Sequence, residues 1–164
     1  MNLSKTRLIK TRLIKTRLIK TRLIKTVALG AAALLALPGA APLSYLDITV
    51  DQLRSPKGLL QLCLTANERS FPDCNDDPAA RKLTARAKDG VARFTDLPPG
   101  QYALAIVHDE NGNSKLDTFA GIPKEGIGFS RNPGFSFGPP QFAKVLFIAQ
   151  GAGTSQRVRI KYYL

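Results

Sequence analysis

The segment from His108 to Asp117 reads His-Asp-Glu-Asn-Gly-Asn-Ser-Lys-Leu-Asp, and it carries the side chains best suited to chemistry. Oxygen atoms that can bind a cation recur at every second position: Asp109, Asn111, Asn113, the main-chain carbonyl of Lys115, and Asp117. A loop with this alternation can wrap a hard cation such as Ca²⁺. The spacing therefore predicts a calcium site built from these five residues.

The segment departs from an EF-hand loop at two positions. Ser114 occupies the sixth position, where that loop needs glycine, and Ala120 occupies the twelfth, where it needs a bidentate glutamate. With two carboxylates, we expect the weak affinity of extracellular calcium modules, a Kd of about 10⁻⁴ to 10⁻³ M. The alternative is a metal-free turn in which Asn and Asp bond their own backbone, and the sequence leaves both readings open.

His108 is the only histidine, and an enzyme could use it as a general base. A histidine-centred triad also needs a nucleophile, but the sequence has no Gly-x-Ser-x-Gly elbow. The nearby acids Asp109, Glu110 and Asp117 share one loop, whereas glycoside hydrolysis needs carboxylates on both sides of a cleft. We therefore expect a non-catalytic protein, with a hydrolase using His108 and these acids as the alternative.

Alternation of apolar and polar residues organises the rest of the chain after residue 41 and predicts strands rather than helices. Pro and Gly separate the runs, and Asp89-Gly90 is a two-residue hairpin signal between the third strand and the fourth. The predicted strands cover residues 46–51, 59–66, 82–87, 91–95, 101–108, 142–149 and 157–164. Seven short strands are typical of an antiparallel β-sandwich, so residues 42–164 are expected to form a single all-β domain.

The two cysteines, Cys63 and Cys74, are predicted to form a disulfide. Cys63 alternates with Leu60, Leu62 and Leu64, so its thiol points away from their face and would be exposed if it were unpaired. An oxidising compartment favours a bridge, and closing a loop of this size stabilises by about 3 kcal/mol.

A long connection over residues 119–140 is dense in Gly, Pro and Phe. Long loops without regular structure are often functional. If this connection is a ligand or partner surface, its expected contact residues are Phe129, Arg131, Phe135 and Phe137. The alternative is a minor core in which the phenylalanines fold under the loop, because exposing several of them favours aggregation.

The first 41 residues are predicted to be a signal peptide. Residues 1–26 contain nine Lys and Arg and no acid, and they include four tandem copies of Lys-Thr-Arg-Leu-Ile from Lys5 to Ile24. Residues 27–37 follow as an uncharged apolar stretch, which is too short to cross a membrane but long enough for the core of a signal peptide. Cleavage is expected near residues 41–44, and the product is expected to be periplasmic or extracellular, without a transmembrane anchor.

Removing this leader changes what the net charge of +12 means. Subtracting its nine basic residues from 24 leaves 15, against 12 acidic residues, so the remainder has a charge of +3. The remaining basic residues are scattered among acids, which argues against nucleic acid as a partner. An envelope protein or a glycan is the partner expected in the predicted compartment.

Several phrases of the chain resemble known bacterial modules. The turn from Phe94 to Tyr102, Phe-Thr-Asp-Leu-Pro-Pro-Gly-Gln-Tyr, resembles that of transthyretin-like and collagen-adhesin B-type β-sandwiches. From about Leu46 to Leu164, the chain resembles an exported bacterial family known as domain of unknown function 2141. The phrases that carry this resemblance are Leu62-Cys-Leu-Thr65, Phe71-Pro-Asp-Cys74, Asp96-Leu-Pro-Pro-Gly100, the 108–117 segment, Gly121-Ile-Pro-Lys-Glu-Gly126, Phe129-Ser-Arg-Asn-Pro133 and Phe137-Gly-Pro-Pro140. The resemblance implies export and a β-sandwich, which is transthyretin-like or immunoglobulin-like, and it implies no activity.

Overall fold

Alternating side chains define the first strand in the computed structural model, which describes residues 43–134 and 138–164. In β1 (Ser44–Asp51), Leu46, Ile48 and Val50 are buried while the residues between them are more exposed. Because successive side chains of a strand point to opposite faces, one face of β1 supplies core residues and the other faces solvent.

Strand β1 lies at the centre of a three-stranded sheet. It pairs in parallel with β10 (Thr154–Arg159) on one side and antiparallel with β4 (Val91–Leu97) on the other. Strands from the beginning and the end of the domain are therefore neighbours.

A five-stranded sheet forms around β5 (Gly100–Asp109), the longest strand. Strand β2 pairs antiparallel with β5 along its length, while β8 and β9 pair with different halves of the other edge of β5. The other strands of this sheet are β2 (Leu59–Thr65), β3 (Arg81–Arg86), β8 (Gly126–Phe129) and β9 (Phe147–Ala149).

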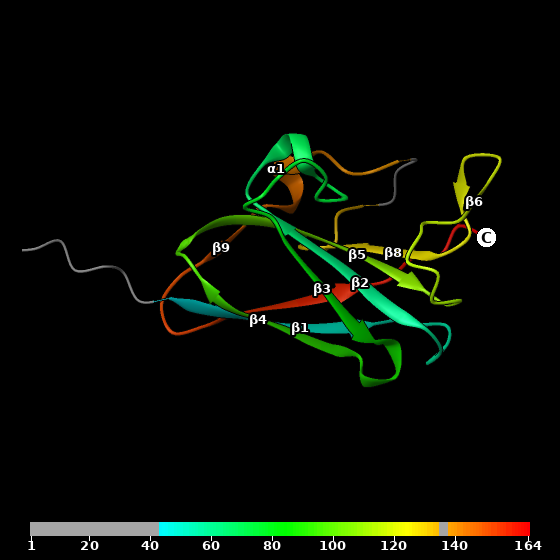
Figure 1. Ribbon diagram of the computed structural model, residues 1–164, viewed down its shortest axis with the longest axis horizontal. Coiled ribbons are helices and arrows are strands. Elements are labelled where there is room, and N and C mark those ends of the chain that lie inside the picture. Colours follow the sequence, from blue (N-terminus) through cyan, green and yellow to red (C-terminus); the bar gives the residue numbers. More distant parts are fainter. Residues whose placement is uncertain (1–42, 135–137) are drawn as a thin grey trace, which may run out of the picture. The chain divides into compact units, whose positions relative to one another are not determined.

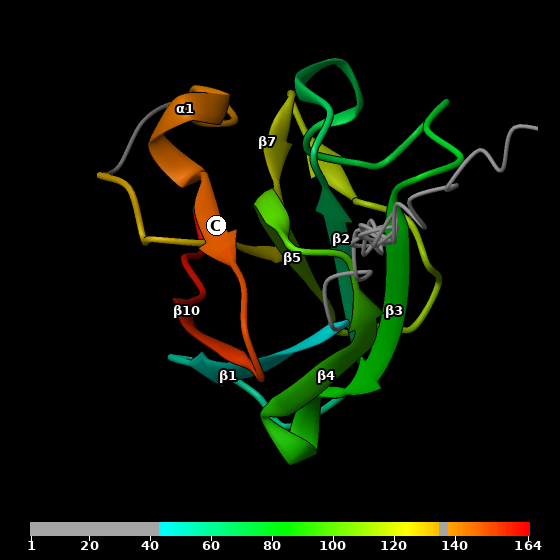
Figure 2. The same cartoon turned by 90° about the vertical axis from the view of Figure 1, so that its left-hand side faces the viewer.

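The two sheets pack face to face, and their inner faces share one hydrophobic core (Figures 1 and 2). Leu46 and Val158 come from the three-stranded sheet, while Leu62 and Leu104 come from the five-stranded sheet. This arrangement confirms the predicted all-β sandwich, which is largely antiparallel apart from the β1–β10 pair.

The connections contain short elements. Strands β6 (Thr118–Phe119) and β7 (Ile122–Pro123) form a small hairpin, which Figure 1 shows at the same end of the domain as the C-terminus. Two 3₁₀ turns, Glu68–Ser70 and Ala87–Asp89, and one helical turn, α1 (Phe142–Val145), complete the described elements.

The predicted hairpin at Asp89-Gly90 is wrong. Strand β3 pairs with β2 in one sheet, whereas β4 pairs with β1 in the other, so this connection crosses between sheets. Only Gly90 takes a positive φ, of 62°, and a tight type I′ turn needs positive φ at both central residues. Ala87 lies in this connection between β3 and β4, and its burial in the hydrophobic core fixes the position of the connection.

Two predicted strands and the predicted long loop also need correction. Residues 142–145 form the helical turn α1, and only β9 remains of the strand predicted over 142–149. The last strand begins at Thr154 and ends at Arg159, earlier than the predicted range of 157–164. The connection over 119–140 contains β7 and β8, because Gly126 and Gly128 let this segment pair with β5 and pack closely on β10.

The predicted disulfide is present. Cys63 and Cys74 are bonded, with their Cα atoms 5.6 Å apart. As the alternation of β2 predicts, the bridge lies on the face opposite Leu60, Leu62 and Leu64. There it forms a small apolar cluster with Ala105, Phe71 and Phe129.

The predicted signal peptide lies outside the described residues, so the leader, its repeats and the cleavage point stay predictions. Within residues 43–134 and 138–164, no helix has the length and apolar character needed to cross a membrane.

Candidate metal-binding loop

The polar loop begins where β5 ends, and the surrounding chain fixes its start. Asp109 is the last residue of β5 and pairs with Leu59 of β2. The backbone at Gly58 lies directly against the carbonyl of Asp109, and a Cβ on Gly58 would collide with that oxygen. Gly58 also has a φ of 76°, which glycine adopts without strain. Both features hold the entrance of the loop in one place.

The carboxylate of Asp109 organises the loop. It is fully buried, and it accepts hydrogen bonds from three consecutive main-chain N–H groups. Its Oδ1 accepts from Gly112 at 2.7 Å and Asn113 at 3.2 Å, and its Oδ2 accepts from Ser114 at 2.7 Å. The loop therefore folds around this side chain as an Asx-type turn.

Ser114 takes a φ of 59°, which is the left-handed conformation. This is the sixth position of the loop, where an EF-hand places glycine for its sharp turn. The serine departs from that pattern in sequence but makes the sharp turn, and its N–H bond to Asp109 helps to hold it.

Asp117 closes the far side of the loop. Its Oδ2 accepts a hydrogen bond from the side-chain amide of Asn111 at 2.7 Å and from that of Asn113 at 3.0 Å. The amide oxygens of Asn111 and Asn113 accept from the N–H groups of Asn113 and Lys115, at 2.9 and 2.8 Å. The structure thus brings the four predicted side-chain ligands into one hydrogen-bonded loop. Lys115, whose carbonyl was the predicted ligand, takes part in this network through its main-chain N–H.

The loop is arranged as a network of N–H donors and oxygen acceptors. Within the described ranges, no group of three or more Asp, Glu, His or Cys side chains is already set in a metal-ligating arrangement. A cation would have to replace amide donors at Asp117. Asn111 and Asn113 are exposed, so this side of the loop is open to solvent.

Glu125 is a member of this site that sequence reasoning missed. It lies between β7 and β8 with only 4% of its surface exposed. Its Oε2 accepts the N–H of Asp117 at 3.2 Å, while its Oε1 has no hydrogen-bond partner. Burial, together with the nearby charges of Asp109 and Asp117, raises the pKa of Glu125 to about 7. In the sequence, the one sign that Glu125 could belong to this site is that it is an acid a few residues after Ala120, the twelfth loop position.

His108 is fully buried, and both of its ring nitrogens are used. Its Nε2 lies 2.8 Å from the carbonyl oxygen of Lys57, and its Nδ1 lies 2.6 Å from the hydroxyl of Tyr162. A carbonyl only accepts, so Nε2 carries the hydrogen, and in the neutral ring Nδ1 accepts from the tyrosine. The Tyr162 hydroxyl also accepts the N–H of Arg54 at 3.1 Å. This histidine joins β5 to two other segments.

Glu110 points away from the loop interior toward Arg54. The guanidinium donates to Glu110 Oε2 from Nη2 at 2.5 Å and from Nε at 2.9 Å. This hydrogen bond lowers the pKa of Glu110. The pairing takes Glu110 out of the group of acids that could act together with His108.

The residues predicted to form one ligand or partner surface do not form a single surface among the described residues. Phe129 lines an apolar cavity of about 410 Å³ on the outer face of the five-stranded sheet. Ala105 and Val107 of β5 form part of its floor, while Leu116 belongs to the polar loop and Ile122 belongs to β7. The cavity and the polar loop therefore share a stretch of chain.

The other predicted surface residues lie elsewhere. The guanidinium of Arg131 donates to the carbonyl of Leu146 at 3.0 Å, so it supports a turn. Phe135 and Phe137 lie outside the described residues. Phe129 packs against Phe71 with ring centroids 5.6 Å apart, as the minor-core alternative predicts for this residue.

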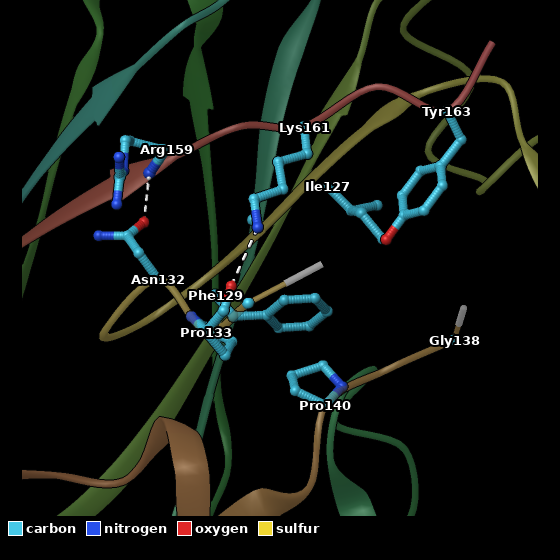
Figure 3. A pocket seen from close by; sticks show the side chains of 11 residues that line it. Ile127, Phe129, Asn132, Pro133, Gly138, Pro140, Arg159, Lys161 and Tyr163 are labelled. Carbon is cyan, nitrogen blue, oxygen red and sulfur yellow. Dashed lines mark hydrogen bonds between the residues drawn. The ribbon is translucent and has the colours of Figure 1, made fainter. Parts of the chain in front are cut away.

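A second, much smaller pocket lies beside β8 (Figure 3). Its volume is about 20 Å³, which holds roughly one water molecule. Two bonds drawn in Figure 3 cross its rim: Arg159 N–H donates to Asn132 Oδ1 at 2.8 Å, and Lys161 Nζ donates to the Pro133 carbonyl at 2.9 Å. These two hydrogen bonds link the turn after β8 to Arg159, the last residue of β10, and to Lys161 just after it.

These observations define a class of protein. It is a small β-sandwich with a disulfide on one outer face and, at the end of its central strand, a polar loop that folds around a carboxylate. Residues 48–157 match the family described as "Uncharacterized protein conserved in bacteria (DUF2141)", and the chain belongs to this family. The match includes both cysteines, the polar loop and Glu125. No curated protein and no solved structure matches the chain.

Proposed function

We propose that this protein is an exported, non-catalytic binding module whose loop from Asp109 to Asp117 takes up Ca²⁺. The observation that carries the proposal is the fold of the loop around Asp109. Three consecutive N–H groups point at this buried carboxylate, and Ser114 makes the positive-φ turn at the sixth position. A calcium loop needs this turn to bring alternate oxygens to one centre.

The surrounding chemistry supports calcium over transition metals. Carboxylate, amide and carbonyl oxygens are hard ligands, which Ca²⁺ prefers, whereas Zn²⁺ and Cu²⁺ favour imidazole and thiolate. The only histidine is held in two hydrogen bonds, and both cysteines are in the disulfide. The disulfide also supports export, because such bonds persist in oxidising compartments.

A hydrolase is the alternative, and the geometry supports it less. A general base must reach the substrate, yet the His108 ring is fully buried and donates to the carbonyl of Lys57. Glu110 is paired with Arg54, and Asp109 is occupied by loop N–H groups. An enzyme of this kind would need these bonds to break before catalysis.

Calorimetric titration of the purified protein with Ca²⁺, repeated with Mg²⁺, tests the proposal. We expect Ca²⁺ to bind with a Kd below about 10⁻³ M and to raise the melting temperature. Asp117→Asn keeps the size of the side chain but removes its charge, so it should weaken binding at least tenfold. Asp76→Asn, at an exposed position in the loop after β2, is the matched control and should bind like the original chain.

Two results would overturn the proposal. One is the absence of heat and of any melting shift at 10 mM Ca²⁺. The other is an Asp117→Asn variant that binds as tightly as the Asp76→Asn control.

A further inference from the structure

The carboxyl group of Glu125 contains a buried oxygen that no donor among the described residues satisfies while the group is ionised. In the part of the chain that the structure describes, its Oε1 is the one buried side-chain nitrogen or oxygen without a hydrogen-bond partner. An unsatisfied buried carboxylate oxygen is costly, and a native fold retains one when something else satisfies it. An ion is one group that does so.

Glu125 is aimed at the polar loop. Its Oε2 accepts from Asp117 N–H, and its carboxyl lies close enough to that of Asp109 for the two to share a hydrogen bond when one of them is protonated. The charges of Asp109 and Asp117 therefore both act on Glu125, although the side chains of the described residues are not yet gathered around a common metal centre. The four ion pairs found among the described residues use Asp47, Asp51, Asp89 and Glu110, so they leave these three acids without a cationic partner.

The path of the chain explains how a residue outside the loop reaches it. Ala120, at the twelfth position, lies exposed on the turn of the β6–β7 hairpin. The N–H of Lys124 donates to the carbonyl of Asp117 at 2.9 Å and closes the base of this hairpin. The next residue, Glu125, is thereby returned to the side of Asp117. It is the seventeenth residue counted from Asp109.

We propose that Glu125 is a ligand of the Ca²⁺ ion held by the 109–117 loop, in the role that the twelfth residue has in an EF-hand. This inference rests on the proposed function and names the ligand that the loop alone lacks. The ion draws Oε1 of Glu125 and the carboxylates of Asp109 and Asp117 together, and the amide N–H groups of Asn111 and Asn113 leave Asp117 as it enters.

Two properties of the site follow. A third carboxylate raises the affinity for Ca²⁺ above that of a loop with two, so we expect a Kd below about 10⁻⁴ M. The ion also connects the end of β5 to the start of β8, on either side of the β6–β7 hairpin. Binding should therefore stabilise the hairpin and the Leu116 side of the apolar cavity.

Calcium titrations of the purified protein and three variants, all at pH 8, test this assignment. Glu125→Gln keeps the shape and removes the charge, and we expect it to weaken Ca²⁺ binding at least tenfold. Glu125→Asp keeps the charge on a shorter side chain and should also weaken binding. Glu68→Gln removes an exposed acid from the turn after β2 and should leave the Kd unchanged.

Melting in EDTA checks that each variant folds, and Glu125→Asp decides the outcome if Glu125→Gln does not fold. If the original chain binds Ca²⁺ and both Glu125 variants bind equally well, Glu125 is not a ligand, although the loop still is. If the original chain does not bind Ca²⁺, the proposed function and this assignment both fail.

Discussion

Glu125 Oε2 accepts a hydrogen bond from the main-chain N–H of Asp117 at 3.2 Å, which ties the segment before β8 to the last residue of the polar loop. The same carboxyl group is buried beside Asp109. Burial and the nearby charges of Asp109 and Asp117 therefore disfavour the ionised form of Glu125, and this cost can be measured through the pH dependence of stability.

The stability of the metal-free protein should fall as the pH rises from about 4.5 to 7. Burial raises the pKa of Glu125 from 4.5 to about 7, so in this window the folded protein holds a proton that the unfolded chain has released. Stability decreases with pH wherever the folded state binds more protons, here by at most about 3 kcal/mol. Urea unfolding in EDTA at pH 5, 6 and 8 measures this.

The Glu125→Gln variant isolates the effect from other titrating groups. Its free energy of unfolding should change less between pH 5 and pH 8 than that of the original chain. Parallel pH profiles for the two proteins would mean that Glu125 titrates at its ordinary pKa in the folded protein.

Replacing both cysteines should destabilise the protein by about 3 kcal/mol. The bridge closes a short loop with a sequence separation of 11, and closing a loop of that size restricts the unfolded chain by this amount. Denaturant unfolding of a Cys63→Ala, Cys74→Ala double variant measures the loss. A change below 1 kcal/mol would show that the apolar cluster around Ala105 and Phe129 holds this face without the bridge.

Local alternation was enough to predict much of the fold. Leu46, Ile48 and Val50 lie on one buried face of β1, and Cys63 lies on the face opposite its leucine neighbours, as their spacing indicates. These features depend on the period of two residues in a strand, which is visible in any single segment. The candidate residues of the polar loop, Asp109, Asn111, Asn113 and Asp117, were singled out for the same reason, because one short segment contains them.

Features that depend on distant partners were missed. The crossing after β3 depends on which sheet receives β4, and the Asp89-Gly90 pair is equally compatible with a hairpin. Glu125 joins the loop because the Lys124 to Asp117 bond closes the hairpin base. The burial of His108 likewise depends on Lys57 and Tyr162, which are far away in sequence. Residue type and local spacing contain no information on such contacts.

Tyr162→Phe should lower the free energy of unfolding by about 1 to 3 kcal/mol. Its hydroxyl donates to Nδ1 of the buried His108, so its removal leaves this buried nitrogen without its partner, while the exposed Arg54 N–H can bond to water instead. Tyr45→Phe is the control, since the Tyr45 side chain is 40% exposed. Equal stability of the two variants would mean that water replaces the hydroxyl and that the tyrosine does not hold His108.

Gly126→Ala tests how closely the segment beside Glu125 must pack. A Cβ at Gly126 would collide with the side chains of Ile160 and Tyr162, so either β8 or the chain after β10 must move. We expect a loss of about 1 to 3 kcal/mol, as is typical of overpacking. Gly134→Ala is the matched control, because a Cβ there meets no atom of the described residues within 4 Å, and it should change stability by less than about 0.5 kcal/mol. Thermal unfolding of both variants in EDTA measures the difference. A Gly126→Ala variant as stable as the control would show that this end of β8 can shift, and that Glu125 is held by its own hydrogen bond to Asp117 rather than by the packing of the strand.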